Sequence, residues 1–337
     1  MVIENLKTLC NLSGVSGFEN TVRDYIVKEI TPFVNKVIVD NIGNVIAIKN
    51  GINERSKKLM LCAHMDEVGL IVTSITTDGY IKFAAVGGID ERILIGKEVK
   101  IGGSMLNGVI GVCPVHLLTK KEREETVKID DLYIDIGAND KSKAESLVKL
   151  GDFIAFDNNF EILGSNIKSK ALDDRIGCQI LIDLLKSSLN YNIVCAFTVK
   201  EEIGCIGATV AANIIKPDVA IILETTTAND IPQVNDDKKV TSINKGVVIP
   251  FMDKGTIYDK ELYNLATNTA SANNIKWQTK TQIAGGNDSK AIQQTTFGVK
   301  VLCLSVPCRY LHTSKTIASY KDIEATENLL RILIDKI

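Results

Sequence analysis

The chain has 337 residues, of which 39 are Lys or Arg and 41 are Asp or Glu, so its formal net charge is −2. This balance excludes a strongly basic nucleic-acid surface and a polybasic membrane patch as the default interpretation, and it favours small soluble substrates or peptides. A hydrophobic share of 45% with 24% charged residues is ordinary globular composition and excludes disorder as the main state. Imidazole chemistry has few candidate positions, because the only histidines are His64, His116 and His312.

The N-terminal segment does not have the layout of a secretory signal, because Glu4 interrupts it early and no long apolar run follows. No later segment approaches the roughly 18 consecutive apolar residues that a membrane-spanning helix needs. The 8 cysteines are scattered without a C-x-x-C pair, mostly within apolar runs, which favours buried reduced thiols over a disulfide framework or a cysteine zinc site. We therefore expect a soluble cytoplasmic protein without a nucleic-acid or membrane partner.

Two helices are expected before any sheet, over residues 3–12 and 19–30, because apolar residues recur there at helical spacing. Residues 36–50 predict a hairpin that turns near Asn41 to Asn44. Residues 58–69, KLMLCAHMDEVG, predict a buried strand that ends in polar groups and carries the first histidine.

Residues 69–164 show short strands separated by turns, with one helical segment near residues 141–150, and so indicate a mostly β unit. Helices and strands alternate after this unit. The expected helices cover residues 173–186, 208–215, 259–273, 289–294 and 319–337, and the expected strands cover residues 191–199, 219–224, 276–282 and 299–306. The simplest fold is an α/β domain formed by residues 1–68 and 165–337, with a β-rich domain of residues 69–164 inserted.

Polar residues that can take part in chemistry follow the ends of the apolar strands or begin a helix. They are His64 and Asp66, Asp173 and Asp174, Glu201 and Glu202, Glu224 and His312. Because ligands bind beyond the carboxyl ends of strands in open α/β sheets, we expect these segments to converge on one crevice. Two imidazoles with several carboxylates suit zinc or cobalt better than calcium or magnesium, so the pattern favours a dinuclear metallohydrolase.

The spacing also suggests roles. Asp66 lies two residues after His64, on the same face of an extended strand. It can hydrogen-bond the ring nitrogen of His64 that does not coordinate a metal. Of the adjacent Glu201 and Glu202, one can bind metal while the other transfers a proton. The structural alternatives stay open at this point: a solvated turn for the glutamate pair, a helix cap for an aspartate at a helix start, and a core position for a lone histidine.

Five segments in order closely resemble the tetrahedral aminopeptidase family, which includes glutamyl aminopeptidase-like and endoglucanase M-like proteins. They are CAHMDEVG (62–69), KALDDRIG (170–177), FTVKEEIG (197–204), LETTTANDIP (223–232) and SVPCRYLHT (305–313). The resemblance implies a co-catalytic zinc-peptidase-like α/β fold, in which helices flank a mixed sheet and a mostly β dimerisation domain is inserted. It also implies a homo-oligomer, in which dimers assemble into a tetrahedral dodecamer.

The resemblance further implies two divalent metal ions per subunit, zinc or cobalt, with manganese as a third choice. The implied ligands are His64 and Glu224 for one ion, Glu202 and His312 for the other, and Asp173 as the bridge. Asp66 would orient His64, and Glu201 would be the general base and acid. His116, in the inserted domain, is expected to be structural.

Some positions remain open. Glu224 stands where many family members have Asp, and Asp230 is the rival ligand, but Glu224 is favoured because it ends a strand. Asn287 and Asp288 are expected to cap a helix, and Arg309 is expected either to contact substrate or to form a salt bridge.

The expected function is a metal-dependent aminopeptidase that removes N-terminal residues from short peptides, with Glu201 as general base to a metal-activated water. One alternative is a glycoside hydrolase, for which two carboxylates suffice, although His64 and His312 would then have no task. The other is a non-catalytic assembly protein, which would have no need of the base. The preferred N-terminal side chain is left open by the sequence.

Overall fold

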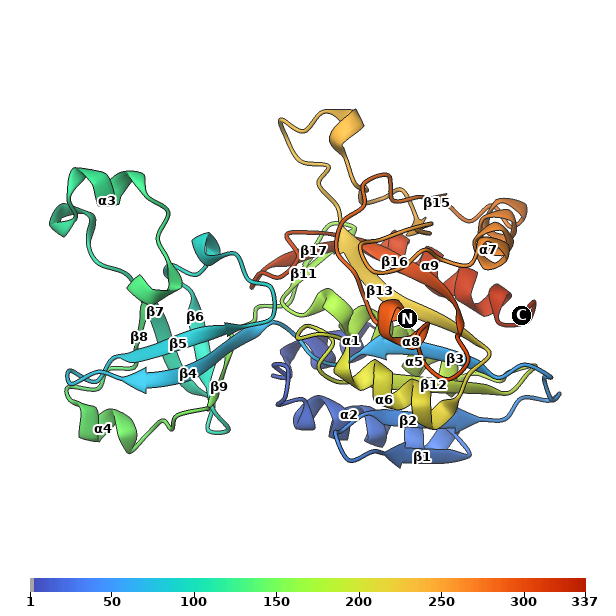
Figure 1. Ribbon diagram of the computed structural model, residues 1–337, viewed down its shortest axis with the longest axis horizontal. Coiled ribbons are helices and arrows are strands. Elements are labelled where there is room, and N and C mark those ends of the chain that lie inside the picture. The colour runs from blue at the N-terminus through green and yellow to red at the C-terminus, as the bar shows by residue number, and fades with distance from the viewer. Residues whose placement is uncertain (1–2) are drawn as a thin grey trace.

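The computed structural model describes residues 3–337, which form an α/β body and a separate closed β-barrel (Figure 1). The body is built on an 11-stranded mixed sheet with the strand order β1-β2-β12-β3-β13-β16-β17-β11-β10, and β14 and β15 attach beside β16. The expected fold class, a mixed α/β sheet flanked by helices with a separate β-rich unit, is confirmed. Within the described residues, no helix is both long and apolar enough to cross a bilayer.

The centre of the sheet consists of four parallel strands whose residues are almost all buried. They are β3 (Leu59–His64), β12 (Ile193–Thr198), β13 (Val219–Thr227) and β16 (Lys300–Arg309). Successive residues of β3 point to opposite faces, so Leu59 and Leu61 join one core cluster while Met60 and Cys62 join the other. Burial on both faces explains why these strands are continuous apolar runs.

Helices cover both faces of this sheet. One face packs against α1 (Ile3–Asn11), α2 (Asn20–Ile30), α5 (Leu172–Lys186), α7 (Lys260–Ala272) and α9 (Tyr320–Leu333). The other face packs against α6 (Ile206–Ile215) and α8 (Ser289–Ile292). All seven helices overlap segments where a helix is expected from the sequence, but α5 begins one residue earlier and α6 two residues earlier than expected.

The outer strands of the sheet run antiparallel to their neighbours. On one side is the expected hairpin of β1 (Lys36–Val39) and β2 (Val45–Lys49). On the other side are β17 (Thr316–Ser319), β11 (Asn166–Ser169) and β10 (Glu161–Leu163). The sequence did not predict β17, because four residues are too few to show an alternating pattern. The strand expected over residues 276–282 is reduced to β15 (Trp277–Gln278), which pairs with β14 (Val247–Val248).

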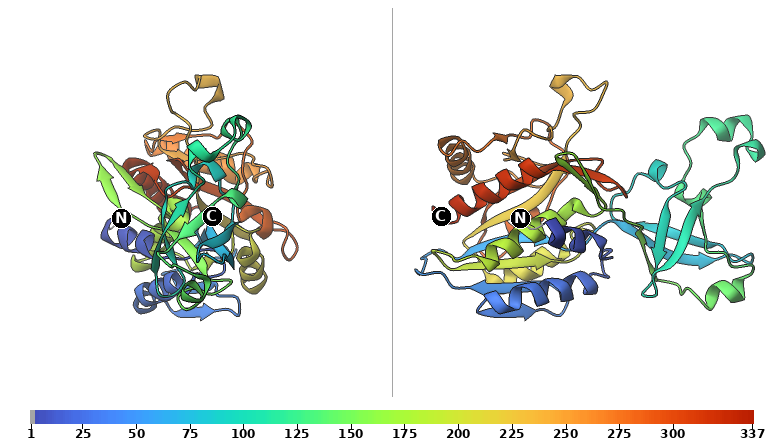
Figure 2. Two further views of the ribbon diagram at one scale, coloured as in Figure 1. Left: turned by 90° about the vertical axis from the view of Figure 1, so that its left-hand side faces the viewer. Right: turned by 180° about the vertical axis from the view of Figure 1, so that it is seen from behind.

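The barrel closes in the order β4-β5-β8-β7-β6-β9, and β9 pairs back with β4. Its strands are β4 (Gly69–Ile75), β5 (Ile81–Val86), β6 (Glu98–Ile101), β7 (Leu106–Gly111), β8 (Tyr133–Asp135) and β9 (Phe153–Phe156). The short helices α3 (Lys120–Glu124) and α4 (Lys141–Glu145) lie in its connections. It has its own apolar core and stands beside the body along the long axis of the molecule (Figure 2). The division into domains at residues 69 and 164 stays a prediction.

Candidate active site

The candidate site lies beyond the carboxyl ends of the parallel strands, on the edge of the sheet that their shared direction creates. His64 is the last residue of β3 and pairs in register with Thr198, the last residue of β12. Glu224 lies within β13, and Asp173 lies at the start of α5. The remaining members follow β12 and β16, so segments far apart in the sequence meet in one crevice, as expected.

Glu201 and Glu202 lie in a turn whose backbone N–H groups donate to the carboxylate of Asp66. Lys200 has a φ of 58°, and this left-handed residue bends the chain directly after β12. The bend directs both following N–H groups to one carboxylate: Asp66 Oδ1 accepts from Glu201 N at 3.0 Å, and Oδ2 accepts from Glu202 N at 3.1 Å. The Ser16 hydroxyl also donates to Asp66 Oδ2, at 2.5 Å. Asp66 is therefore the anchor of the turn that carries both glutamates.

Asp66 is fully buried, and its surroundings keep it ionised. Burial alone raises the pKa of its carboxyl group, but the hydrogen bond and charge of His64, with the Ser16 and Glu201 donors, bring that pKa below its ordinary value. The carboxylate also comes within 3.5 Å of His64 Nδ1, although the main-chain oxygen of Asp66 is closer to that nitrogen, at 3.1 Å. Residue 66 orients His64 mainly through its backbone, and the carboxylate mainly supports the turn.

The two histidines of the site have matching environments. His64 Nε2 lies 3.4 Å from Asp173 Oδ1 and 3.5 Å from Glu224 Oε1. His312 Nε2 lies 3.5 Å from Asp173 Oδ2 and 3.5 Å from Glu202 Oε1. Each imidazole thus faces one oxygen of Asp173 and one glutamate, which is a geometry suited to a carboxylate that bridges two cations.

His312 is oriented by the loop that follows β5 of the barrel. Its Nδ1 lies 2.8 Å from the main-chain oxygen of Gly88, as Nδ1 of His64 lies near that of residue 66. Both histidines therefore direct Nε2 towards the carboxylates. No sequence pattern points to Gly88, because a backbone carbonyl can come from any residue.

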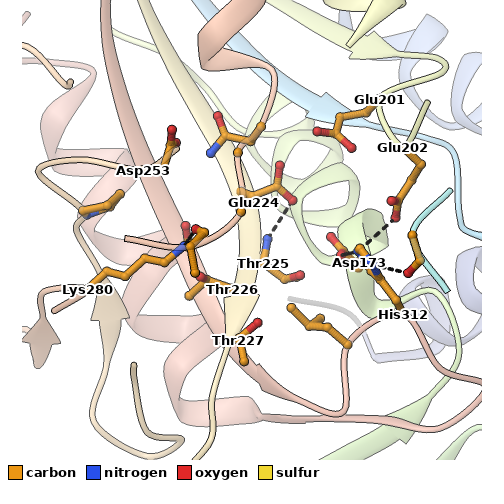
Figure 3. Close-up of a pocket in the computed structure, with 18 of the residues that line it drawn as sticks. Asp173, Glu201, Glu202, Glu224, Thr225, Thr226, Thr227, Asp253, Lys280 and His312 are labelled. Carbon is orange, nitrogen blue, oxygen red and sulfur yellow. Dashed lines mark hydrogen bonds and ion pairs between the residues drawn. The ribbon is translucent and has the colours of Figure 1, made fainter. Parts of the chain in front are cut away.

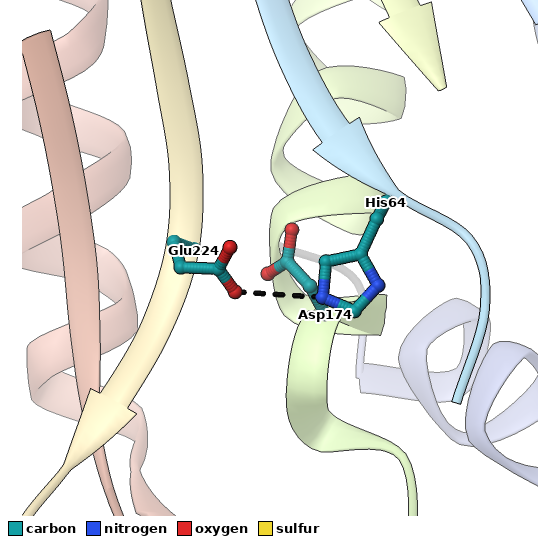
Figure 4. Close-up of side chains that lie close together, drawn as sticks. All are labelled: His64, Asp174 and Glu224. Carbon is teal, nitrogen blue, oxygen red and sulfur yellow. Dashed lines mark ion pairs between the residues drawn. The ribbon is translucent and has the colours of Figure 1, made fainter. Parts of the chain in front are cut away.

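Asp174 adds another buried carboxylate beside His64 and Glu224 (Figure 4). Its Oδ1 accepts a hydrogen bond from Gly177 N at 3.0 Å, so the helix-capping interpretation applies to Asp174. Burial, and then the charge of Glu224, raise the pKa of Asp174 well above its ordinary value. Oδ2 of Asp174 is buried without a hydrogen-bond partner.

The donor set fits divalent cations. Two groups offer ligand atoms within 4.8 Å of one another, namely His64 with Asp174 and Glu224, and His64 with Asp173 and Glu202. Burial, followed by the charge of Asp173, raises the pKa of Glu202 to about 7; burial also raises the pKa of Glu224 to about 8. Such crowding of buried carboxylates is unfavourable unless positive charge neutralises it, and a mixed N/O donor set is typical of zinc, cobalt or manganese.

The site opens into a cavity of about 500 Å³ (Figure 3). The catalytic candidates and His312 lie on one side of this cavity, and Asp253 and Lys280 lie on the other. The Asp253 carboxylate already accepts hydrogen bonds from the backbone N–H groups of Gly255 and Thr256 and from the Tyr258 hydroxyl. Lys280 is the only Lys or Arg among the described residues that line the cavity.

The structure separates the rival candidates from the site. Both carboxylate oxygens of Asp230 accept from Arg309, at 2.8 and 2.7 Å, so Arg309 takes the salt-bridge role and Asp230 is engaged away from His64. His116 lies in an exposed turn of the barrel unit.

The expected helix cap at residues 287 and 288 is only half right. Asn287 Oδ1 accepts from Ser289 N at 2.9 Å, as a cap does. Asp288 makes no capping bond, and its Oδ2 instead accepts from the Thr198 hydroxyl at 2.6 Å, deep in the sheet. The Asp288 carboxylate therefore accepts from the buried hydroxyl on β12 and not from the backbone N–H groups at the start of α8.

The sequence matches a family of known peptidases. The family model for M42 glutamyl aminopeptidases matches residues 43–329. The chain is 31% identical to the lysyl aminopeptidase of Pyrococcus furiosus, covering 99% of this chain and 97% of the relative. It is 30% identical to the glutamyl aminopeptidase of Lactococcus lactis, covering 99% and 96%.

Solved structures show the same similarity. A TET aminopeptidase from a marine-sediment Thaumarchaeota archaeon superposes with a TM-score of 0.95 at 32% identity, covering 99% of this chain and 96% of that one. The TET1 peptidase of Pyrococcus horikoshii, described as assembling into a tetrahedron or a large octahedral shell, superposes with a TM-score of 0.87 at 36% identity, covering 98% of each chain.

Proposed function

The chain belongs to the M42 glutamyl aminopeptidase family, and from this premise we propose that it is a dinuclear metallo-aminopeptidase that removes N-terminal residues from short peptides. The observation that carries the proposal is the position of Asp173, whose two carboxylate oxygens each face the Nε2 atom of a different histidine. A glycoside hydrolase has no use for this pair of imidazoles.

Five residues are the proposed ligands. His64 and Glu224 would hold one ion, Glu202 and His312 the other, and Asp173 both. Zinc or cobalt, with manganese as a third choice, would polarise the scissile carbonyl as a Lewis acid and lower the pKa of water. The length of Glu224 is compatible with this role, because its Oε1 comes within 3.5 Å of His64 Nε2.

Glu201 is the proposed general base and acid. The side chains of both glutamates line the cavity, but Glu202 Oε1 faces His312 Nε2 and is better placed as a ligand. The Glu201 carboxylate would accept a proton from the attacking water and then donate that proton to the leaving amine nitrogen. Asp66 supports this role by fixing the backbone from which the Glu201 side chain extends.

Lys280 supports a preference for an acidic N-terminal residue. The two relatives above carry opposite names, lysyl and glutamyl, so the family alone does not decide the preference. Lys280 donates to the main-chain oxygen of Ala284 and forms no carboxylate ion pair within residues 3–337. Burial lowers the pKa of this ammonium group, and a substrate carboxylate beside it would favour the charged form. Its charge would attract a Glu or Asp side chain and repel Lys or Arg.

The barrel is the proposed dimerisation unit, in a homo-oligomer that reaches the tetrahedral dodecamer. It exposes large apolar side chains at Val115, Leu117 and Leu150, which are 65%, 67% and 67% exposed. Exposed apolar residues in one unit are a common feature of protein interfaces. The assembled structures of the P. horikoshii relative lend further support.

A panel of aminoacyl chromogenic substrates, assayed with added zinc, cobalt or manganese, tests the proposed function. We expect release of the N-terminal residue, loss of activity after chelation and recovery after metal addition. Absence of hydrolysis on every substrate with every metal, or metal-independent release of sugar from a glycan, would contradict the proposal.

A further inference from the structure

A second cluster of metal-binding side chains lies beside the proposed base. Glu201, Cys205 and Asp288 each offer one ligand atom, and these atoms lie within 4.8 Å of one another. They come from the turn after β12, from the residue before α6 and from the residue before α8. Cys205 Sγ lies 3.5 Å from Glu201 Oε1, so its thiol donates a hydrogen bond to that carboxylate.

Asp288 indicates independently that a ligand belongs in this cluster. Its side chain is only 1% exposed. Oδ2 accepts from the Thr198 hydroxyl at 2.6 Å and from Cys62 Sγ at 3.6 Å, which fixes the carboxylate group. Oδ1 is buried and has no hydrogen-bond partner. A buried carboxylate oxygen without a partner is costly, and a cation bound to it would remove that cost.

The cluster can be reached without passing through the candidate active site. Glu201 lines the active-site cavity, whereas Cys205 lines a second cavity of about 430 Å³ together with Gly204, Thr209, Lys290 and Gln294. An ion can therefore enter from this second side. No residue among the proposed ligands of the dinuclear centre lines the second cavity.

We propose that Glu201, Cys205 and Asp288 form a third cation site, which binds a thiophilic divalent cation such as zinc or cadmium and inhibits the enzyme. One thiolate with two carboxylates suits these ions better than magnesium or calcium, which take oxygen ligands only. On binding, the Cys205 thiol releases its proton to solvent and the sulfur donates an electron pair to the cation. Neither the sulfur nor the cation changes its oxidation state in this step.

Inhibition follows from the shared residue. Glu201 cannot accept a proton from water while its carboxylate oxygen is bound to a cation. This consequence rests on the proposed role of Glu201, but the binding of the cation does not. Occupancy of the third site is expected to lower turnover by about 100-fold, the lower end of what general acid–base catalysis contributes.

Cobalt titration of the full chain tests the site, because a cobalt–thiolate bond gives a charge-transfer band in the near ultraviolet. The proposed dinuclear centre has no sulfur ligand, so the first two equivalents should give no such band. A third equivalent should bring the band and the loss of turnover. If the chain proves inactive on all peptides, the band still tests the third site alone.

Two variants complete the test. C205S should bind two equivalents of cobalt, give no thiolate band and resist inhibition by excess metal. C113S, which changes the exposed cysteine of the barrel unit, should behave like the unaltered protein. The proposal is overturned if binding stops at two equivalents, if a third equivalent gives no thiolate band, or if the band persists in C205S.

Discussion

Asp66 accepts the backbone N–H of Glu201 through Oδ1 at 3.0 Å, across 135 positions of the sequence. The other oxygen accepts from the next residue of the same turn, so one buried carboxylate sets the position of the proposed base and of a proposed ligand. This turn therefore depends on the residues that directly follow the strand carrying the first histidine.

Replacing Asp66 with Asn should damage this turn. An amide has a single acceptor oxygen, so one of the two backbone N–H groups of the turn would face an NH₂ group and lose its partner. Leaving one buried donor unsatisfied costs about 1–3 kcal/mol. We expect a lower unfolding free energy in chemical denaturation and a loss of kcat of about tenfold or more. In the matched control S16A, which removes only one donor to Asp66, the loss should be smaller. Full activity and stability in D66N would show that the turn keeps its conformation without the second carboxylate oxygen of Asp66.

Replacing His312 with Ala should remove one metal equivalent per subunit. This change deletes the Nε2 atom that faces Asp173 and Glu202 and leaves the surroundings of His64 in place. Metal content after dialysis, measured by atomic emission, reports the effect. H116A is the matched control, because His116 is exposed and belongs to none of the candidate metal-binding groups among the described residues. Unchanged metal stoichiometry in H312A would show that another residue is the ligand.

Metal affinity should rise with pH across the neutral range. Burial raises the pKa of Glu202 to about 7 and that of Glu224 to about 8 in the metal-free chain, so both carboxyl groups retain protons near neutrality. A cation must displace these protons, and lower pH therefore weakens binding. Calorimetry of zinc binding at pH 6.5 in buffers of different ionisation enthalpy should show net proton release, which should diminish at higher pH. Proton uptake, or affinity independent of pH, would contradict this linkage.

The preference for acidic substrates should depend on Lys280. Replacing it with Met removes the only Lys or Arg charge among the described cavity residues while preserving much of the chain length. We expect kcat/KM for a glutamyl substrate to fall by about tenfold to 100-fold, equivalent to about 1.4–2.8 kcal/mol, with little change for a leucyl substrate. K290M, which alters a lysine of the second cavity, is the control. An unaltered glutamyl-to-leucyl ratio in K280M would exclude Lys280 as the determinant.

The sequence predicted the crevice well because its signals were local. Apolar runs that lead into His64, Glu201 or Glu224 indicate the carboxyl edge of a parallel sheet, and the parallel pairing of β3 with β12 and β13 brings these segments together. The short strands separated by turns also predicted a mostly β unit over residues 69–164, but not its closure into a barrel.

The remaining features depend on contacts that leave no sequence signal. The main-chain oxygen of Gly88 orients His312 from 224 positions away, and any residue type could supply that oxygen. Asp288 resembled a helix cap, but the hydroxyl of Thr198 in the neighbouring strand binds its carboxylate instead. Such outcomes are set by tertiary packing, which overrides local propensity.

The central claim is that Glu201 moves the proton while other residues hold the metal, and the E201Q variant tests it most directly. An amide of the same shape cannot accept the proton, so metal content and turnover should separate in this variant. We predict two metal equivalents per subunit at the dinuclear centre, as in the unaltered protein, with kcat on the best aminoacyl substrate reduced by about 100-fold or more. Turnover near that of the unaltered protein, or loss of the metal itself, would contradict the account.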